Sequence, residues 1–153
     1  MTTTIATSTV EDLTLTINDE ILVKATPEVV FETLLEQLGP QQVAGADDKP
    51  MPMVIEAFPG GRWYRDLGQG DGHFWATVQA IKRGTLLEFC GPLMMSQAVS
   101  NNVQYRLTAT PEGTRITFHH YGVGLISDEH KKGLAAGWRM INERVARHAE
   151  AKK

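Results

Sequence analysis

The segment from residue 53 to residue 124 constrains the fold most, because it consists of short strand-like runs separated by tight turns. Six such runs follow one another: 53–56, 62–65, 73–81, 85–90, 101–110 and 114–121. Turn-forming residues separate several of them, as in Pro59-Gly60-Gly61, Lys82-Arg83-Gly84 and Pro111-Glu112-Gly113. Connections this short join antiparallel neighbours, whereas parallel strands need a long crossover. The segment therefore predicts an antiparallel meander.

The residues before this segment predict one more strand and two short helices. Leucine and isoleucine alternate with polar residues over 13–18, which is typical of a half-buried strand, and the strand continues through 21–23. Thr26-Pro27-Glu28 is a helix start, because threonine caps and proline is tolerated in the first turn. Gly39-Pro40 ends this helix. We expect a second short helical piece around residues 41–44 and a loop over 46–52.

The C-terminal residues predict a long amphipathic helix from about 128 to 149. A capping serine and two acidic residues open it, and four apolar residues form one stripe: Leu134, Trp138, Ile141 and Val145. Gly133 and Gly137 stand in its first half, where each glycine costs about 1 kcal/mol relative to alanine. We expect something to pass close to this stretch, either a sheet backbone or a ligand.

Together these elements predict an α+β fold. A curved antiparallel sheet of about seven strands wraps around the long C-terminal helix, with the two short helices after the first strand. A chain of 153 residues has the usual size of one domain. We assign residues 13–150 to that domain and expect 1–12 to be a flexible tail.

A sheet that curves around a helix cannot follow it along its whole length, so the fold predicts a cavity. The candidate lining residues are large and mostly apolar: Trp63, Trp75 or its neighbour Phe74, Phe89, Met94, Met95, Tyr105, Phe118, Trp138 and Ile141. The alternative for any one of them is that it fills the core, as most aromatic and methionine clusters do.

Several local patterns, in their order and spacing, resemble the START-like SRPBCC superfamily over residues 13–149. They are Ala25-Thr26-Pro27-Glu28-Val29-Val30-Phe31, Pro59-Gly60-Gly61-Arg62-Trp63-Tyr64, the run from Gly72 to Ile81, Leu86-Leu87-Glu88-Phe89, Gly113-Thr114-Arg115-Ile116-Thr117 and Gly137-Trp138. Within the superfamily, the chain is most similar to bacterial proteins that resemble the C-terminal domain of the activator of heat-shock-protein-ninety ATPase.

The resemblance implies a helix-grip fold with a mostly apolar cavity. Members bind lipids, sterols, polyketides or other hydrophobic molecules, and some are cyclases or aromatase-like enzymes. The family offers no invariant catalytic set to carry over. The heat-shock activator role fits less well, because the separate N-terminal chaperone-binding domain of those activators is not found here.

Three polar residues are candidates for contacts with a ligand. Alternation with Ile116 and Phe118 turns His120 inward, as a general base, a ligand anchor or a histidine bonded to a neighbouring strand. Arg65 shares a strand face with Trp63, so it either receives a carboxylate at the cavity rim or pairs on the surface with Asp66 or Glu56. The hydroxyl of Tyr105 needs a partner if it is buried, whether protein or ligand.

Other chemistries find little support. His119 and His120 are adjacent on one strand and face opposite sides, so they do not predict a metal site, and we expect no cofactor. Cys90 is the only cysteine and lies in an apolar run, as a packed thiol would. A net charge of -3 argues against a nucleic-acid partner. With neither a secretory signal nor an apolar run long enough to span a membrane, we expect a cytoplasmic protein.

The connection Gly91-Pro92-Leu93-Met94-Met95-Ser96 carries three large apolar residues, which is unusual for an exposed loop. It predicts either a lid over the pocket or a homodimer contact.

Three functions stay open from the sequence. The first is a carrier or sensor that binds a small hydrophobic or amphipathic molecule, and it requires a cavity. The second is a polyketide cyclase- or dehydratase-like enzyme, which requires His120, Tyr105 and Arg65 to converge on one point. The third is a chaperone-associated protein-binding domain, which requires a large exposed apolar patch around Met94 and Met95.

Overall fold

The computed structural model describes residues 3–5 and 9–152. Of the predicted N-terminal tail, residues 1–2 and 6–8 lie outside this part. The elements are β1 (Thr14–Val23), α1 (Pro27–Leu38), β2 (Val43–Ala44), β3 (Lys49–Pro50), β4 (Val54–Ile55), β5 (Arg62–Gly68), β6 (Asp71–Lys82), β7 (Leu86–Gly91), β8 (Val99–Thr110), β9 (Gly113–Gly124) and α2 (Asp128–Ala151).

The main sheet has seven strands in the order β1-β9-β8-β7-β6-β5-β4, and neighbouring strands are antiparallel. Strands β4 to β9 form the predicted meander, and β1 joins it at the far edge by pairing with β9. This confirms the curved sheet of about seven strands. Its side chains alternate between a buried face and an exposed face, most regularly in β8 and β9.

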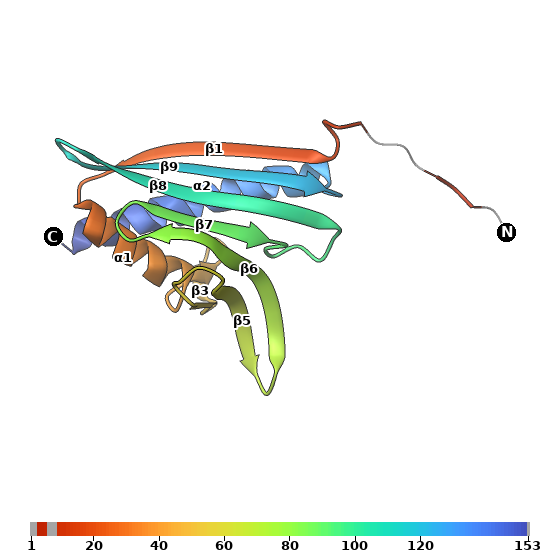
Figure 1. Cartoon of the computed structure of the whole chain (residues 1–153), viewed down its shortest axis with the longest axis horizontal. Coiled ribbons are helices and arrows are strands. Elements are labelled where there is room, and N and C mark those ends of the chain that lie inside the picture. Colours follow the sequence, from red (N-terminus) through yellow and green to blue (C-terminus); the bar gives the residue numbers. More distant parts are fainter. Residues whose placement is uncertain (1–2, 6–8, 153) are drawn as a thin grey trace.

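Helix α2 lies across the buried face of the sheet, running behind β1, β9 and β8 (Figure 1). The side chain of Ser127 caps it by accepting a hydrogen bond from the backbone N–H of His130 at 3.1 Å. Leu134, Trp138 and Val145 of the predicted stripe are buried, and Ile141 is half-buried. The predicted helix therefore forms, with two more residues at its C-terminal end.

Helix α1 follows β1 and packs against α2 near the C-terminus (Figure 1). Its start is as predicted, with Pro27 in the first turn and the Thr26 hydroxyl accepting from the backbone N–H of Val29 at 3.3 Å. An ion pair between Glu36 and Lys152 joins the two helices at 2.6 Å.

The prediction of a second short helix around residues 41–44 is wrong. A turn and the two-residue strand β2 stand there instead, and β2 pairs with β3. Met51 donates its backbone N–H to the carbonyl of Gln42 at 2.9 Å, so this segment bonds across to the returning chain. Four residues give too few helical hydrogen bonds to offset the cost of helix nucleation.

The hairpin of β5 and β6 bends away from the body of the sheet (Figure 1). Register shifts between Trp63 and Tyr64, and between Asp66 and Gly68, accompany this bend.

Candidate functional site

Six of the aromatic residues predicted to line a cavity pack in two groups of three rings. The ring of Trp63 lies 5.0 Å from that of Trp75 and 4.6 Å from that of Phe89. The ring of Phe118 lies 4.9 Å from both Tyr105 and Trp138. All six side chains are buried. Phe74, the alternative to Trp75, is 43% exposed on the opposite face of β6.

The indole and phenol groups of this cluster are satisfied by protein partners. Trp63 donates its Nε1–H to the carbonyl of Leu38 at 2.8 Å. The hydroxyl of Tyr105 donates to Oδ1 of Asn142 on α2 at 2.8 Å, and Asn142 donates in turn to Asp19 on β1 at 3.3 Å. Burial and the charge of Asp19 raise the pKa of Tyr105 well above its usual value. Tyr105 is thereby a neutral donor tied to α2.

His120 faces inward, as the alternation predicts, and is completely buried. Its Nδ1 accepts a hydrogen bond from Nε1 of Trp138 at 2.9 Å, and its Nε2 lies 2.6 Å from Oδ1 of Asn101. The amide nitrogen of Asn101 donates to the carbonyls of Gly91 and Pro92, so Oδ1 of Asn101 accepts from His120. Both ring nitrogens are therefore engaged in a neutral imidazole. Burial, and secondarily His119, lower the pKa of His120 to about 4.

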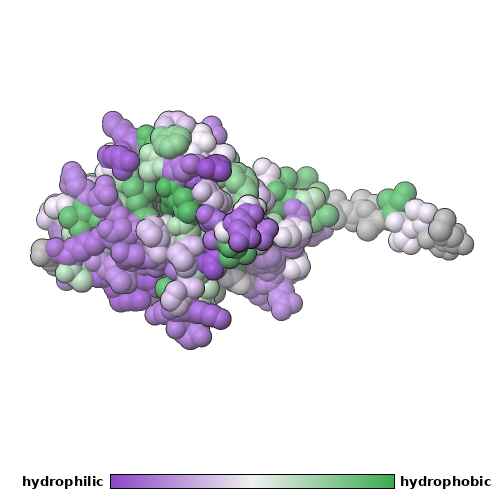
Figure 2. All heavy atoms as spheres, turned by 90° about the horizontal axis from the view of Figure 1, so that it is seen from below, coloured by the Kyte–Doolittle hydropathy of each residue, from purple (hydrophilic) through white to green (hydrophobic). Residues whose placement is uncertain are grey.

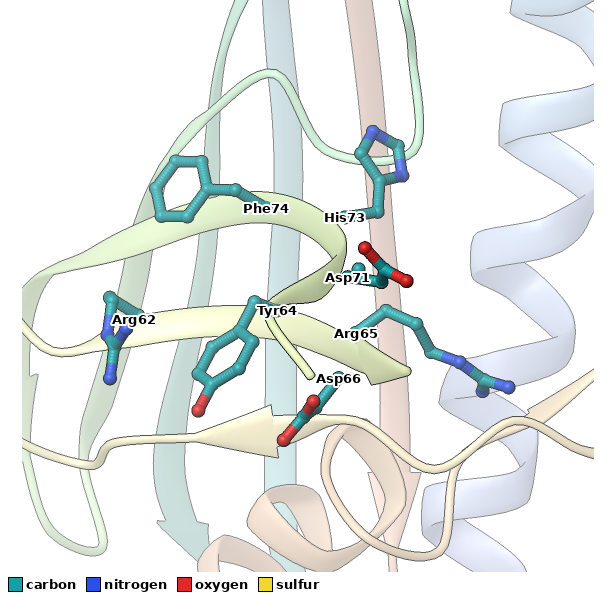
Figure 3. Close-up of a pocket in the computed structure, with 9 residues that line it drawn as sticks. Arg62, Tyr64, Arg65, Asp66, Asp71, His73 and Phe74 are labelled. Atoms are coloured by element: carbon teal, nitrogen blue, oxygen red, sulfur yellow. The ribbon is translucent and has the colours of Figure 1, made fainter. Parts of the chain in front are cut away.

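Arg65 lies on the β5–β6 hairpin, directly across from His73 in the ladder. Both side chains extend toward the α2 side of the hairpin, whereas Tyr64 and Phe74 extend to the other side (Figure 3). Arg65 donates to the carbonyl of Pro52 at 3.3 Å, and His73 accepts from the indole of Trp75 at 3.2 Å. Glu56, a partner considered for Arg65, pairs with Arg62 instead.

A shallow pocket of about 460 Å³ surrounds these hairpin residues. Its walls include Arg62, Arg65, Asp66 and Asp71, which are polar and largely open to solvent. Tyr64 and Phe74 also line it, so polar and apolar groups share this pocket equally, whereas sites for hydrophobic ligands are predominantly apolar.

A smaller pocket of about 220 Å³ lies between α2 and the connection from β7 to β8, and it is mostly apolar. Its lining brings together three residues of the predicted site with four others on α2: Met94, Trp138 and Ile141, with His130, Gly133, Leu134 and Gly137. We call it the α2 pocket. Figure 2 shows the side of the molecule from which the hairpin projects, and hydrophobic atoms gather there in a hollow bordered by hydrophilic ones.

The two glycines of the α2 pocket face open space. A Cβ atom placed on Gly133 or Gly137 would meet nothing within 4 Å outside the helix itself. No sheet backbone in the described chain packs against them, so the prediction that a sheet backbone passes close to these glycines is wrong. The alternative prediction, that a ligand lies close to the helix here, stays a prediction.

The connection between β7 and β8 is firmly held. Leu93 donates its backbone N–H to the carbonyl of Trp75 at 2.7 Å, and Leu93 and Met95 are 1% and 2% exposed. Met95 is thus part of the interior, while Met94 is half-buried and forms one wall of the α2 pocket. The exposed Met94–Met95 patch that a protein-binding role requires is therefore absent from this segment.

Several polar residues around these sites were not singled out from the sequence. Asn101, Asn142 and Asp19 hold His120, Tyr105 and α2 in place, and His130 forms the polar end of the α2 pocket. An asparagine at an inward position of β8 or on the buried face of α2 was the available signal, because a buried amide needs partners.

Within residues 3–5 and 9–152, no three histidine, cysteine, aspartate or glutamate side chains are grouped to hold a metal ion. In the same part of the chain, neither helix has the length and apolar character needed to cross a bilayer.

Comparison with solved structures shows the fold class. The chain is similar to the Aha1 dimer from Colwellia psychrerythraea, with 16% identity and a TM-score of 0.65 over 89% of this chain and 96% of that one. It is similar to Ara h 8.0201, with 12% identity and a TM-score of 0.65 over 90% and 99%. A third similar structure is the di-domain ARO/CYC StfQ from the steffimycin biosynthetic pathway, with 15% identity and a TM-score of 0.64 over 94% of this chain and 52% of that one.

These likenesses define a helix-grip fold. No protein-family model matches the chain, and no curated protein matches it.

Proposed function

We propose that this protein binds a small hydrophobic molecule reversibly in the α2 pocket, as a carrier or sensor. The observation that carries the proposal is the open space beside Gly133 and Gly137 in a pocket walled by Met94, Leu134, Trp138 and Ile141. Two glycines in the middle of a helix cost stability, and outside the helix no atom of the described residues lies within 4 Å of the Cβ position at either glycine. A ligand in this space would bury the exposed helix backbone and the apolar walls.

The ligand site is therefore displaced from the interior to its edge. Phe118 packs behind Trp138 and Tyr105 packs against Phe118, whereas Trp63, Trp75 and Phe89 form a separate group in the interior. In this proposal Met94, Trp138 and Ile141 contact the ligand directly. Arg65 and His120 lie outside this contact set, since neither lines the α2 pocket.

The three residues on which the enzyme hypothesis depends do not converge on one point. His120 is bonded to Trp138 and Asn101, Tyr105 to Asn142, and Arg65 to the carbonyl of Pro52 on the hairpin. Three groups engaged with three separate sets of partners do not present one reaction centre. Binding without chemistry is the function that this geometry favours.

Titration calorimetry with the two-ring probe 2-naphthol tests the proposal. Gly137→Leu places a side chain in the pocket, whereas Ala136→Leu adds the same side chain at an exposed position of the same helix. We expect the wild type and Ala136→Leu to bind the probe equally and Gly137→Leu to bind it at least about tenfold more weakly, the loss of about 1.4 kcal/mol. No binding by the wild type, or equal binding by all three proteins, would contradict the proposal.

A further inference from the structure

We propose that the α2 pocket selects a molecule of one or two rings that carries a hydrogen-bond acceptor facing His130, and that it excludes long-chain lipids. This inference rests on the proposed function and specifies the chemical class of its ligand.

The volume of the pocket sets the size of the ligand. Pockets that hold drug-sized ligands have about 300–1,000 Å³, and an engineered apolar cavity of about 150 Å³ holds benzene. At about 220 Å³, the α2 pocket lies between these two cases. One or two rings fit within this space, whereas a sterol or a fatty acyl chain would extend beyond it.

Packing behind the pocket prevents a longer ligand from continuing inward. Trp138 forms the wall nearest the core, is 2% exposed, and packs its ring 4.9 Å from Phe118. Its indole is also fixed by the hydrogen bond to His120. A chain reaching beyond the pocket would have to displace this buried indole and break that bond.

The walls favour a flat, aromatic ligand. Gly133 and Gly137 are one helical turn apart, so they leave a strip of bare helix backbone about 6 Å long at 1.5 Å per residue. A planar ring can lie closer to such a strip than a branched group can. Met94, on the opposite wall, provides a thioether, and sulfur makes favourable contacts with aromatic rings.

One end of the pocket is polar. Nδ1 of His130 lies 3.3 Å from the side-chain nitrogen of Gln97, which can only donate a proton there. With the Gln97 amide nitrogen donating to Nδ1, a neutral His130 carries its proton on Nε2, which has no hydrogen-bond partner among the described residues. A hydroxyl or carbonyl oxygen on the ligand would accept this proton.

Methyl NMR on protein labelled at the methionine methyl groups tests the inference, with the Met94 signal identified by its loss in Met94→Leu. The probes are para-cresol, para-xylene and palmitate. The first two have the same shape and differ only in a hydroxyl group in place of a methyl group. We expect both ring compounds to shift the Met94 signal at saturation, and palmitate to leave it unchanged. We expect His130→Ala to weaken binding of para-cresol about fivefold more than binding of para-xylene, as for the loss of one hydrogen bond.

The other outcomes separate this inference from the proposed function. If palmitate shifts Met94 and Gly137→Leu abolishes that shift, the pocket binds ligands but the size limit is overturned. Equal effects of His130→Ala on both ring compounds would overturn the role of His130. If none of the three probes shifts Met94, both the inference and the proposed function fail.

Discussion

His120 is a buried histidine whose two nitrogens are both used in the neutral form. Adding a proton to Nδ1 would break the hydrogen bond from the Trp138 indole, and burial already disfavours the charge. The structure therefore depends on a histidine that stays uncharged.

This arrangement predicts a loss of stability in mild acid. The pKa of His120 is about 4 in the folded protein, against an ordinary value of 6.5, so below pH 6.5 the unfolded chain binds the extra proton first. The stabilising contribution is complete above pH 6.5 and decreases by about 3 kcal/mol by pH 4. Urea unfolding across this range measures it.

The matched variant for that measurement is His120→Gln, which keeps a polar side chain at the site but removes the titratable imidazole. Its free energy of unfolding should fall less steeply between pH 6.5 and pH 4 than that of the wild type. Identical slopes for the two proteins would show that His120 does not carry the pH dependence.

Tyr105 provides a second prediction at the same scale. Tyr105→Phe removes the donor to Asn142 and leaves a buried amide oxygen without its partner, so we expect a loss of about 1–2 kcal/mol in the free energy of unfolding. Tyr121→Phe is the control. The hydroxyl of Tyr121 is exposed and makes only a long 3.4 Å bond to Asn18, and its removal should change stability by less than about 0.5 kcal/mol.

At this scale, strand alternation predicted the direction of a side chain but not its partner. It turned His120 inward and His119 outward, and both predictions are confirmed. The partners Asn101 and Asn142 lie 19 and 37 residues away in the chain from the groups that they bind. Such pairs depend on strand register and on how α2 docks, which no local pattern contains.

Helix α2 combines a firmly buried C-terminal half with a first half that is open on one face. Leu134, Trp138 and Val145 are buried, whereas a Cβ placed on Gly133 or Gly137 would meet no described atom within 4 Å outside the helix. The two glycines thus make the first half of α2, which lines the pocket, less stable than alanine would at the same positions.

Replacing either glycine should therefore stabilise the protein. Gly133→Ala and Gly137→Ala each remove backbone freedom from the unfolded chain and meet no steric obstacle, so we expect each to raise the free energy of unfolding by about 1 kcal/mol. Thermal and urea unfolding measure this gain.

Gly91→Ala is the contrasting variant in the same unfolding experiments. A Cβ there would clash with the backbone carbonyl oxygen of Trp75 in the neighbouring strand, so we expect a loss of about 1–3 kcal/mol in the free energy of unfolding. If the α2 variants were destabilised as well, protein atoms would have to occupy the space that we assign to a ligand.

The elements themselves were largely predictable, because long periodic patterns and caps are local. Such patterns predicted α2 and the strands from β5 to β9 to within three residues at each end, and Thr26 and Ser127 cap as predicted. The exception is the segment around Gln42, whose backbone partner is Met51 across a turn. The glycines of α2 indicated a nearby partner, but only the packed structure shows that this partner is not the sheet.

The whole molecule has a filled aromatic interior and, at the edge of that interior, an open pocket. Two groups of three aromatic rings take up interior space where the fold predicted a cavity, and the α2 pocket lies where the β7–β8 connection faces α2. Residue types alone cannot separate these cases, since tryptophan and methionine serve equally well in a core and in a pocket wall. Only Met94, Trp138 and Ile141 of the predicted lining reach the pocket.

Native mass spectrometry of gently purified protein tests the central claim most directly. The wild type, Gly137→Leu and Ala136→Leu are expressed and purified in parallel, and each native mass is compared with that of its denatured chain. The account predicts an added mass of a small molecule on the wild type and on Ala136→Leu, and none on Gly137→Leu. A bare native mass for all three proteins, or the same added mass on all three, would contradict it.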